Sequence, residues 1–387
     1  MTILEKIAGR IGLMTASLVP LRNSSGLFFF FPFFHVGGAE RVHAEIVACF
    51  AEERPWVFFA KRSCNDAFRS LFARGGRLFN LWWLLKYSYP VSAGVLAGII
   101  NRHGHPVVFG CNSLFFYKMI PFLEPHVRVV DLIHAFGGGA EEFSRPVVGR
   151  LDARVIITGA TRDDMAAQYE RDGIPFEFLE RVVLIENQVP IPSAFPPKGE
   201  DVCLRAIFVG RGSEEKRVRL VGRIASACRA QGLPVSVTLV GDVSAGLDDA
   251  DLPSCHLTGE VTDAEALAAI YDQADLLLLT SSREGFPLVV MEAMAHGVVP
   301  LCTRVGGIPA HVRHGENGML VESGSEEQIV NDFVACIGRL CRDTALRQRL
   351  AREAYVWAAA NFGAERFCRS YRALLLGERG SEAPCPR

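Results

Sequence analysis

The segment LLLLTSSREGFPLVVMEAMAHGVVPL, residues 276–301, shows the repeating unit of the chain in its clearest form. It begins with an apolar run, Leu276–Thr280, that has the length of a buried strand. A polar loop follows, and Pro287 then stands at the expected first position of an apolar helix, Leu288–His296. A second apolar run, Val299–Thr303, comes directly after the helix. This order of strand, helix and strand is typical of a parallel sheet covered by helices.

Two carboxylates interrupt this apolar segment. Glu284 lies in the loop at the carboxyl end of the expected strand, and Glu292 lies inside the helix. A buried carboxylate needs a polar partner, because its desolvation is costly. Carboxylates only accept hydrogen bonds, so the hydroxyls of a sugar would suit them, and the free N–H groups of the first helical turn could hold a phosphate close by. A structural ion pair between Glu292 and an arginine is the alternative.

Similar apolar runs recur from residue 26 onward and fall into two series. A proline-rich segment without helical period, ENQVPIPSAFPPKGED, separates them and is typical of an interdomain linker. The runs that predict strands are Leu27–Phe31, Trp56–Ala60, Val107–Gly110, Val129–Ile133 and Val155–Thr158, then Ala206–Val209, Val235–Val240, Leu276–Thr280 and Val299–Thr303. We therefore predict an α/β protein of two doubly wound domains.

The domain boundaries follow from these patterns. We expect a first domain over residues 1–187, a linker over 188–203 and a second domain over 204–362. The end of the chain, from Glu326 to Leu376, is nearly all helical in pattern, with a last helix at 363–376. Residues 377–387 are expected to be a frayed tail.

Composition excludes several classes of function. The net charge of −2 predicts no nucleic-acid partner, although the first 130 residues carry +7 and the remainder −9. The 11 cysteines are scattered without a C-x-x-C pair, so we expect free thiols in a reducing cytoplasm. The N-terminal aromatic run LFFFFPFF is short and contains a proline, so we expect neither a signal peptide nor a membrane-spanning helix.

Glycine and cation patterns near the strand ends suggest a phosphate ligand. The chain has neither G-x-G-x-x-G nor G-x-x-x-x-G-K-[ST] after its first strand, which disfavours a nicotinamide oxidoreductase. Instead, Gly37 and Gly38 open a helix, where backbone N–H groups could approach an anion; a plain tight turn is the alternative. Arg211 and Lys216 follow the first strand of the second series, where a phosphate would bind; a solvated charged loop would look the same.

Together these residues resemble the family 4 retaining glycosyltransferases of the GT-B architecture. The resemblance rests on E-x7-E within EGFPLVVMEAMAHGVVPLCTRVGGIP, on VGRGSEEK, and on GGAERV near the start. It implies two Rossmann-like domains facing across a cleft: an N-terminal acceptor domain and a C-terminal nucleotide-sugar donor domain. It also implies that the last helix crosses back onto the first domain.

The resemblance also implies roles for single residues. Glu292 would bind the ribose hydroxyls and Glu284 the hydroxyls of the transferred sugar. Arg211 and Lys216 would neutralise the diphosphate. His134, in VVDLIHAFGGG, resembles the active-site histidine that contacts the donor sugar. The remaining positions of the implied donor site are Gly37, Gly38, Gly285, Phe286, Leu288 and Val289.

Two positions depart from the family pattern. Ala310 stands where members often carry a glutamate, and LIENQVPI replaces the usual segment after the first domain, keeping only Asn187 of its polar positions. These departures affect the details of donor binding rather than the fold.

No metal or cofactor is expected. The only obvious D-x-D, Asp249 to Asp251, lies in a polar loop, and two cations with a helix N-terminus could stabilise a nucleoside diphosphate leaving group without a metal. No residue is well placed as a covalent nucleophile. The resemblance implies that the acceptor attacks the sugar on the same face from which the nucleoside diphosphate departs.

The expected protein is a retaining, nucleotide-sugar-dependent hexosyltransferase that acts on a glycan or lipid-linked acceptor, in bacterial lipopolysaccharide, capsule or exopolysaccharide synthesis. A catalytically silent nucleotide-sugar-binding or scaffold protein is the alternative; a glycoside hydrolase would not need Arg211 and Lys216. The segments ILEKIAGRIGLM and LFNLWWLLKYSYP fit either a surface resting on anionic lipid or core helices with solvated arginines. The expected location is the cytoplasm. A peripheral location on the inner face of the plasma membrane is the alternative.

Overall fold

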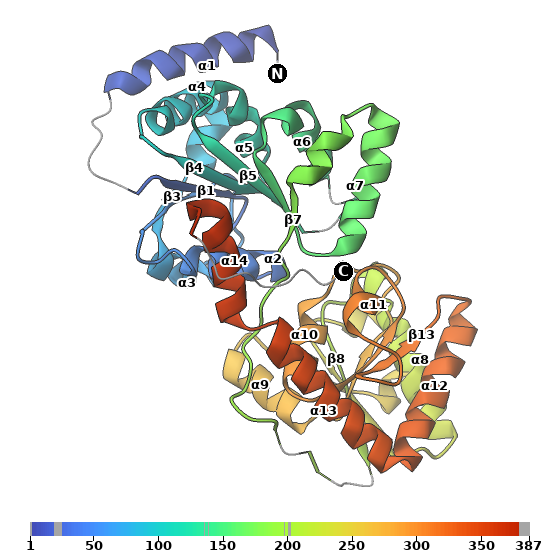
Figure 1. Ribbon diagram of the computed structural model, residues 1–387. Helices are drawn as coiled ribbons and strands as arrows, with labels where there is room; N and C mark the ends of the chain where they lie inside the picture. The colour runs from blue at the N-terminus through green and yellow to red at the C-terminus, as the bar shows by residue number, and fades with distance from the viewer. Residues whose placement is uncertain are drawn as a thin grey trace. The chain divides into compact units, whose positions relative to one another are not determined.

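The computed structural model describes residues 2–18, 25–134, 136–137, 139–196, 198–199 and 203–378. It divides into two compact units (Figure 1). The N-terminal unit runs to Glu186 and takes up the chain again from Phe367, and the C-terminal unit is Asn187–Arg366. Each unit is a parallel sheet with helices on its faces, so the predicted α/β architecture is confirmed.

The sheet of the N-terminal unit has seven strands in the described residues, in the order β3-β2-β1-β4-β5-β6-β7. All neighbouring strands are parallel. The strands are β1 (Leu27–Phe31), β2 (Trp56–Phe59), β3 (Arg77–Asn80), β4 (Val107–Cys111), β5 (Arg128–Ile133), β6 (Ala153–Ile156) and β7 (Val182–Leu184).

Phenylalanines fill both faces of this sheet. Phe28 and Phe30 belong to the core on one face, whereas Phe29 and Phe31 point to the other, because successive side chains of a strand alternate. All four are almost fully buried. A strand covered on both faces reads as a continuous apolar run, which is why LFFFF is uninterrupted.

Helices cover both faces of the sheet (Figure 1). One face carries α4 and α5, and the other carries α2, α3 and α14. The helices of this unit are α1 (Ile3–Thr15), α2 (Gly38–Ala48), α3 (Arg69–Gly75), α4 (Trp82–Asn101), α5 (Leu114–Met119), α6 (Ala140–Ser144), α7 (Gly159–Asp172) and α14 (Ala364–Leu376).

Helix α1 packs closely on α4 through glycines. A Cβ atom on Gly94 would lie 1.8 Å from the carbonyl oxygen of Gly9, and one on Gly12 would lie 2.1 Å from that of Val91. Only glycine allows the two backbones to approach this closely. The apolar side chains of α1 are thereby left on its outer side, where Ile3, Ile7 and others are exposed.

The last helix, α14, is joined covalently to the N-terminal unit. Cys368 forms a disulfide with Cys49 at the end of α2. Arg372 of the same helix also pairs with Glu53 at 2.7 Å and donates to the carbonyl oxygen of Cys49. The prediction that all cysteines are free thiols is therefore wrong for this pair. Their separation of 319 residues gives no sequence signal, because only folding brings the two Cα atoms to 5.1 Å.

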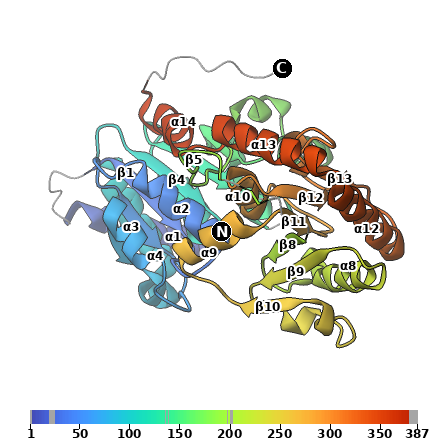
Figure 2. The ribbon, with the colours of Figure 1, turned by 90° about the horizontal axis from the view of Figure 1, so that it is seen from below.

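The sheet of the C-terminal unit has the order β10-β9-β8-β11-β12-β13 in the described residues, again with parallel neighbours. Figure 2 shows this order across the sheet. The strands are β8 (Leu204–Val209), β9 (Val235–Val240), β10 (His256–Gly259), β11 (Leu276–Leu279), β12 (Val299–Thr303) and β13 (Met319–Val321). The helices are α8 (Val218–Ala230), α9 (Ala264–Gln273), α10 (Leu288–Ala295), α11 (Ile308–His311), α12 (Glu326–Arg342) and α13 (Thr344–Asn361).

The local expectations for residues 276–301 hold with one correction. The strand, loop, helix and second strand occur as β11, a loop, α10 and β12. Pro287 is the N-cap residue with an extended backbone, rather than the first helical residue. The described residues of the expected linker, 188–196, 198–199 and 203, contain no helix or strand. The expected frayed tail lies outside the described residues from 379 onward.

Candidate functional site

The first cluster of candidate residues lies at one edge of the C-terminal sheet. Strands β8 and β11 are parallel neighbours, so the loops after Val209 and Leu279 leave the sheet at the same carboxyl edge. These loops carry Arg211, Lys216 and Glu284, as the sequence predicts for a site at strand ends.

The backbone is unusually close-packed at this edge. A Cβ on Gly306 would lie 1.7 Å from the carbonyl oxygen of Glu284, and Gly306 has a φ of +54°. A Cβ on Gly241, with a φ of +126°, would lie 1.9 Å from the carbonyl oxygen of Gly210. Both positions require glycine for space and for backbone conformation.

Lys216 and Glu284 form an ion pair within this cluster. The Nζ of Lys216 lies 2.5 Å from Oε1 of Glu284, and the hydroxyl of Ser281 donates to the same oxygen at 2.5 Å. The Glu284 side chain is 9% exposed and that of Lys216 is 21% exposed. The carboxylate is therefore paired and nearly buried.

Arg217 holds the two loops together, and sequence reasoning missed it. Its guanidinium donates to the carbonyl oxygens of Thr280 and Ser281 at 2.6 and 3.0 Å. Thr280 in turn donates its hydroxyl hydrogen toward the carbonyl oxygens of Lys216 and Arg217. Arg217 has a left-handed backbone with φ +48°, a feature that a run of charged residues does not reveal.

Arg211 is exposed, just after β8. Its charge and that of Lys216 contribute to a lowered pKa of Glu215, whose main cause is a hydrogen bond from Ser213. The cations at this edge are thus partly balanced by Glu215 and Glu284. A bound diphosphate would compete with these carboxylates for Lys216.

Glu292 is the carboxylate inside the apolar helix α10, and it has a polar partner there. It is 8% exposed, and the hydroxyl of Tyr271 on α9 donates to its Oε2 at 2.9 Å. A tyrosine hydroxyl is thus one polar partner of this carboxylate. Sequence reasoning missed Tyr271, because it lies 21 residues before Glu292.

The remaining donor-site candidates of this unit lie at the start of α10. Leu288 and Val289 form its first turn, and Pro287 provides no side-chain cap, so the N–H groups there face no capping side chain. The carbonyl oxygen of Gly285 accepts from the N–H of Gly307 at 2.8 Å. Phe286 is only 4% exposed and stacks on His311 at 4.2 Å, so its ring belongs to the core and only its backbone lies with the site.

The candidates of the N-terminal unit lie at the carboxyl edge of its own sheet. Gly37 is the N-cap of α2 with an extended φ of 176°, and Gly38 is the first helical residue. The carboxylate of Glu40 lies against this helix end, 2.0 Å from where a Cβ of Gly37 would be. An anion bound here would meet the charge of Glu40.

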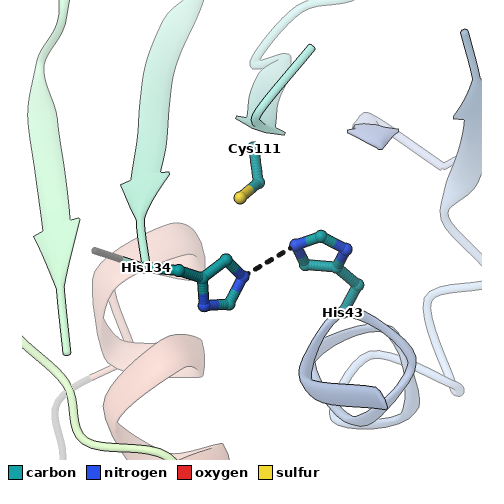
Figure 3. Close-up of side chains that lie close together, drawn as sticks. All are labelled: His43, Cys111 and His134. Atoms are coloured by element: carbon teal, nitrogen blue, oxygen red, sulfur yellow. Dashed lines mark hydrogen bonds between the residues drawn. The ribbon is translucent and has the colours of Figure 1, made fainter. Parts of the chain in front are cut away.

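His134 lies directly after β5 and contacts two residues that the sequence did not single out. Its Nε2 is 2.9 Å from Nε2 of His43 on α2 (Figure 3). The thiol of Cys111, the last residue of β4, lies beside both rings. Because β1, β4 and β5 are neighbours and α2 follows β1, three strand ends bring these residues together.

Burial keeps both imidazoles neutral. It lowers the pKa of His134 to about 4, and with the neighbouring His134 it lowers the pKa of His43 well below the usual value. Burial raises the pKa of the Cys111 thiol, with further contributions from Asp131 and Glu40. A neutral imidazole at a strand end can exchange hydrogen bonds with a polar ligand.

These two sheets, with candidate residues at the carboxyl edge of each and a last helix that returns to the first unit, define the GT-B fold of glycosyltransferases. Solved structures show the same fold. Anabaena HepE in complex with UDP is similar with a TM-score of 0.70 and 18% identity, over 91% of this chain and 100% of that chain. The lipopolysaccharide outer core galactosyltransferase WaaB is similar with a TM-score of 0.70 and 17% identity, over 91% and 99%.

Sequence comparison matches part of the chain to a family model. Residues 204–343 match the model of the group 1 glycosyl transferases, a segment that includes Arg211, Lys216, Glu284 and Glu292. The chain is 33% identical over 108 residues to the N-acetyl-alpha-D-glucosaminyl L-malate synthase of Bacillus anthracis, covering 28% of this chain and 27% of that protein. It is 29% identical over 287 residues to the D-inositol 3-phosphate glycosyltransferase of Salinispora arenicola, covering 66% of this chain and 60% of that protein. The chain thus spans from about a quarter to three fifths of the length of these relatives.

Proposed function

We propose that this protein is a retaining glycosyltransferase that transfers a sugar from a nucleoside diphosphate donor to a glycan or lipid-linked acceptor. The observation that carries the proposal is the cluster of Arg211, Lys216, Glu284 and Glu292 around β8, β11 and α10, within the segment that matches the group 1 glycosyl transferases. It combines cations, a helix N-terminus and carboxylates, the groups that diphosphates and sugar hydroxyls require. The solved complexes of HepE with UDP and UDP-glucose suggest a uridine donor.

Each residue has a role that its position supports. Arg211 and Lys216 bind the diphosphate, and the N–H groups of Leu288 and Val289 add the positive end of α10. Glu292, oriented by Tyr271, accepts from the ribose hydroxyls, and Glu284 accepts from the transferred sugar. In the N-terminal unit, the His134 imidazole is the proposed partner of a sugar hydroxyl.

The chemical step is departure of the diphosphate. Negative charge develops on the leaving oxygen, and preorganised cations stabilise it without a metal ion. Lys216 is held by Glu284 before the donor binds, and the diphosphate competes with this carboxylate for the lysine. The acceptor hydroxyl then attacks from the face that the diphosphate leaves, which retains the configuration.

The N-terminal unit offers a place for an amphipathic acceptor. A cavity of about 220 Å³ is lined by Ala60, Lys61, Leu85, Tyr89, Leu114, Phe115 and Lys118. Two lysines beside an aromatic floor suit an anionic group attached to an apolar chain. Lys118 lies 4.7 Å from the ring centre of Tyr89 and also pairs with Glu5.

The outer face of α1, the short 3-10 helix Ala16–Leu18 after it and the start of α4 form an apolar and basic surface next to this cavity. We name it the apolar face; its exposed members are Ile3, Leu4, Ile7, Ile11, Met14, Leu18, Trp83, Leu84 and Tyr87. Lys86 lies over the rings of Trp83 and Tyr87, and Lys6 and Arg10 lie on α1. We propose that this face rests on anionic lipid at the inner face of the plasma membrane. No helix in the described residues is both long and apolar enough to cross a membrane.

Donor binding tests the proposal first. Calorimetric titration with UDP, GDP, ADP and CDP sugars should find one nucleotide that binds wild type and binds Glu292→Ala at least about 10-fold more weakly, the effect of losing hydrogen bonds to a charged group. Glu322→Ala is the matched control, because Glu322 is an exposed carboxylate of the same unit that pairs with Arg304. Absence of binding, or equal binding by Glu292→Ala, contradicts the donor site.

A measurement of turnover distinguishes an active transferase from a catalytically silent nucleotide-sugar-binding or scaffold protein. The scaffold alternative predicts donor binding without hydrolysis or transfer. The proposal predicts slow donor hydrolysis that Lys216→Ala abolishes, and a released sugar whose first-formed anomer, followed by NMR, keeps the donor configuration.

A further inference from the structure

We propose that His43, Cys111 and His134 form a zinc-binding site in the N-terminal unit. Their candidate ligand atoms, two imidazole nitrogens and one sulfur, lie within 4.8 Å of one another. Figure 3 shows the thiol directed toward the space beside the two rings. No other group of three such residues gathers in the part of the chain that the structure describes.

The two histidines contact each other through the nitrogens that a metal would use. Both Nε2 atoms face each other at 2.9 Å, so one nitrogen must carry a hydrogen and only the other can accept it. His43 is 1% exposed, and its Nδ1 has no hydrogen-bond partner among the described residues. An ion bound at Nε2 would leave the hydrogen of the His43 imidazole on this Nδ1, so the Nδ1 atom is not part of the proposed ligand set. A cation beside the pair would use the lone pairs of both Nε2 atoms.

The fold holds the three ligands in place. Cys111 ends β4 in the middle of the sheet and is 1% exposed. The ring of His43 stacks on Phe31, with centres 4.4 Å apart and planes at 16°. His134 follows β5 and keeps partial exposure, which gives an ion access. A site built on packed strand ends needs only small side-chain shifts to close around a metal.

The ligand types select the metal. Two imidazoles and a thiolate suit zinc, whereas magnesium and calcium require oxygen ligands and none of the three provides one. Zinc accepts a tetrahedral set of three protein ligands and one water. Binding forms a zinc–sulfur bond and releases the thiol proton to solvent, because the ion stabilises the thiolate that burial disfavours.

The consequence for the enzyme is inhibition, and this part rests on the proposed function. Zinc would take the Nε2 of His134 away from the donor sugar. Because the proposed transfer uses no metal, the bound ion would be an inhibitor and not a cofactor. Zinc should therefore reduce transfer by wild type and have little effect on Cys111→Ser.

The site is tested directly with Co²⁺ as a spectroscopic probe and Zn²⁺ by calorimetry, on metal-free full-length protein. One Co²⁺ per chain should bind with a thiolate-to-metal charge-transfer band, and Zn²⁺ should displace it. Cys111→Ser should lose the band. Cys302→Ser is the matched control, because Cys302 is also a buried cysteine near the end of a central strand, in the other unit. His43→Phe should weaken Zn²⁺ binding at least about 100-fold, the upper end of what even outer-shell changes cost, while its ring can keep the stack on Phe31.

The outcomes separate the proposals. A folded wild-type protein that gives no charge-transfer band overturns the zinc site, as does a band of equal strength in Cys111→Ser. Equal Zn²⁺ affinity in wild type and His43→Phe also overturns it. These measurements use no sugar nucleotide, so failure of the zinc site leaves the transferase proposal standing, and a chain that binds no donor can still show the band.

Discussion

Lys216 and Glu284 are 68 residues apart in sequence, yet the lysine Nζ lies 2.5 Å from the glutamate Oε1 at the carboxyl edge of the C-terminal sheet. The pair is mostly buried and lies between two loops that Arg217 and Thr280 tie together. Removing one member leaves the other charge desolvated without compensation. The pair therefore stabilises this edge of the sheet. It also positions the Lys216 ammonium group, which would bind an anionic ligand.

The first prediction is that Lys216→Met lowers the stability of the C-terminal unit by ~1–3 kcal/mol, since Glu284 loses its charged partner. Glu284→Gln in addition should restore part of the loss. Hydrogen exchange of peptides from this unit at increasing urea measures both. Arg304→Met is the control, because its pair with Glu322 is exposed and should cost less than ~0.5 kcal/mol. Equal costs for the two single variants would show that the Lys216 pair is not buried in solution.

The second prediction concerns the buried ion pair between Asp131 of β5 and Arg154 of β6 in the N-terminal unit. Asp131 is fully buried, accepts from Arg154 at 2.6 Å and from the hydroxyl of Tyr117 at 3.1 Å. Asp131→Asn should lower stability by ~3–5 kcal/mol, because the buried guanidinium loses its counter-charge. Urea unfolding followed by hydrogen exchange of N-terminal peptides measures the loss. Asp131→Asn with Arg154→Met should be more stable than Asp131→Asn alone; a double variant that is less stable would contradict this account.

The third prediction is that Cys49 and Cys368 do not react with a thiol reagent in denatured, unreduced protein and do react after reduction, whereas the eight free cysteines of the described residues react in both cases. Reduction should destabilise the N-terminal unit by ~2–4 kcal/mol, because the bridge between Cys49 and Cys368 closes a long loop. The variant Cys49→Ala with Cys368→Ala should melt at the temperature of the reduced wild type and no longer respond to reductant. Reaction of Cys49 and Cys368 without reductant would show that the bridge is absent.

The fourth prediction tests the apolar face. Ile3→Glu with Ile7→Glu should remove most binding to vesicles containing phosphatidylglycerol, because both side chains are exposed and would face the lipid. Binding should fall with added salt and be weak on phosphatidylcholine alone, since the lysines and arginines supply the electrostatic part. Vesicle flotation measures each case. Val356→Glu is the control, because Val356 is an apolar residue of the C-terminal unit that is as exposed as Ile7. Unchanged flotation of the Ile3 and Ile7 variant would assign membrane binding to another surface.

The sequence by itself determined the interior strands of both sheets. All nine strands predicted from apolar runs are present, within one or two residues at each end. Among the described residues, the strands that it did not predict are β3, β7, β10 and β13, the two edges of each sheet. The reason is physical: a central strand is covered on both faces and must be apolar throughout, whereas edge strands are short or, like β3 and β10, largely exposed, and so lack that signal.

Local pattern also placed Glu284, Arg211 and Lys216 at one sheet edge, because parallel strands end on the same side. Only the tertiary structure decided which groups touch. Tyr271 as the partner of Glu292, Arg217 as the tie between loops, the Cys49–Cys368 bridge and the meeting of His43, Cys111 and His134 all join residues distant in sequence. Such contacts depend on register, rotamer and backbone conformation, and these are set when helices pack on a sheet and not by the periodicity of either segment.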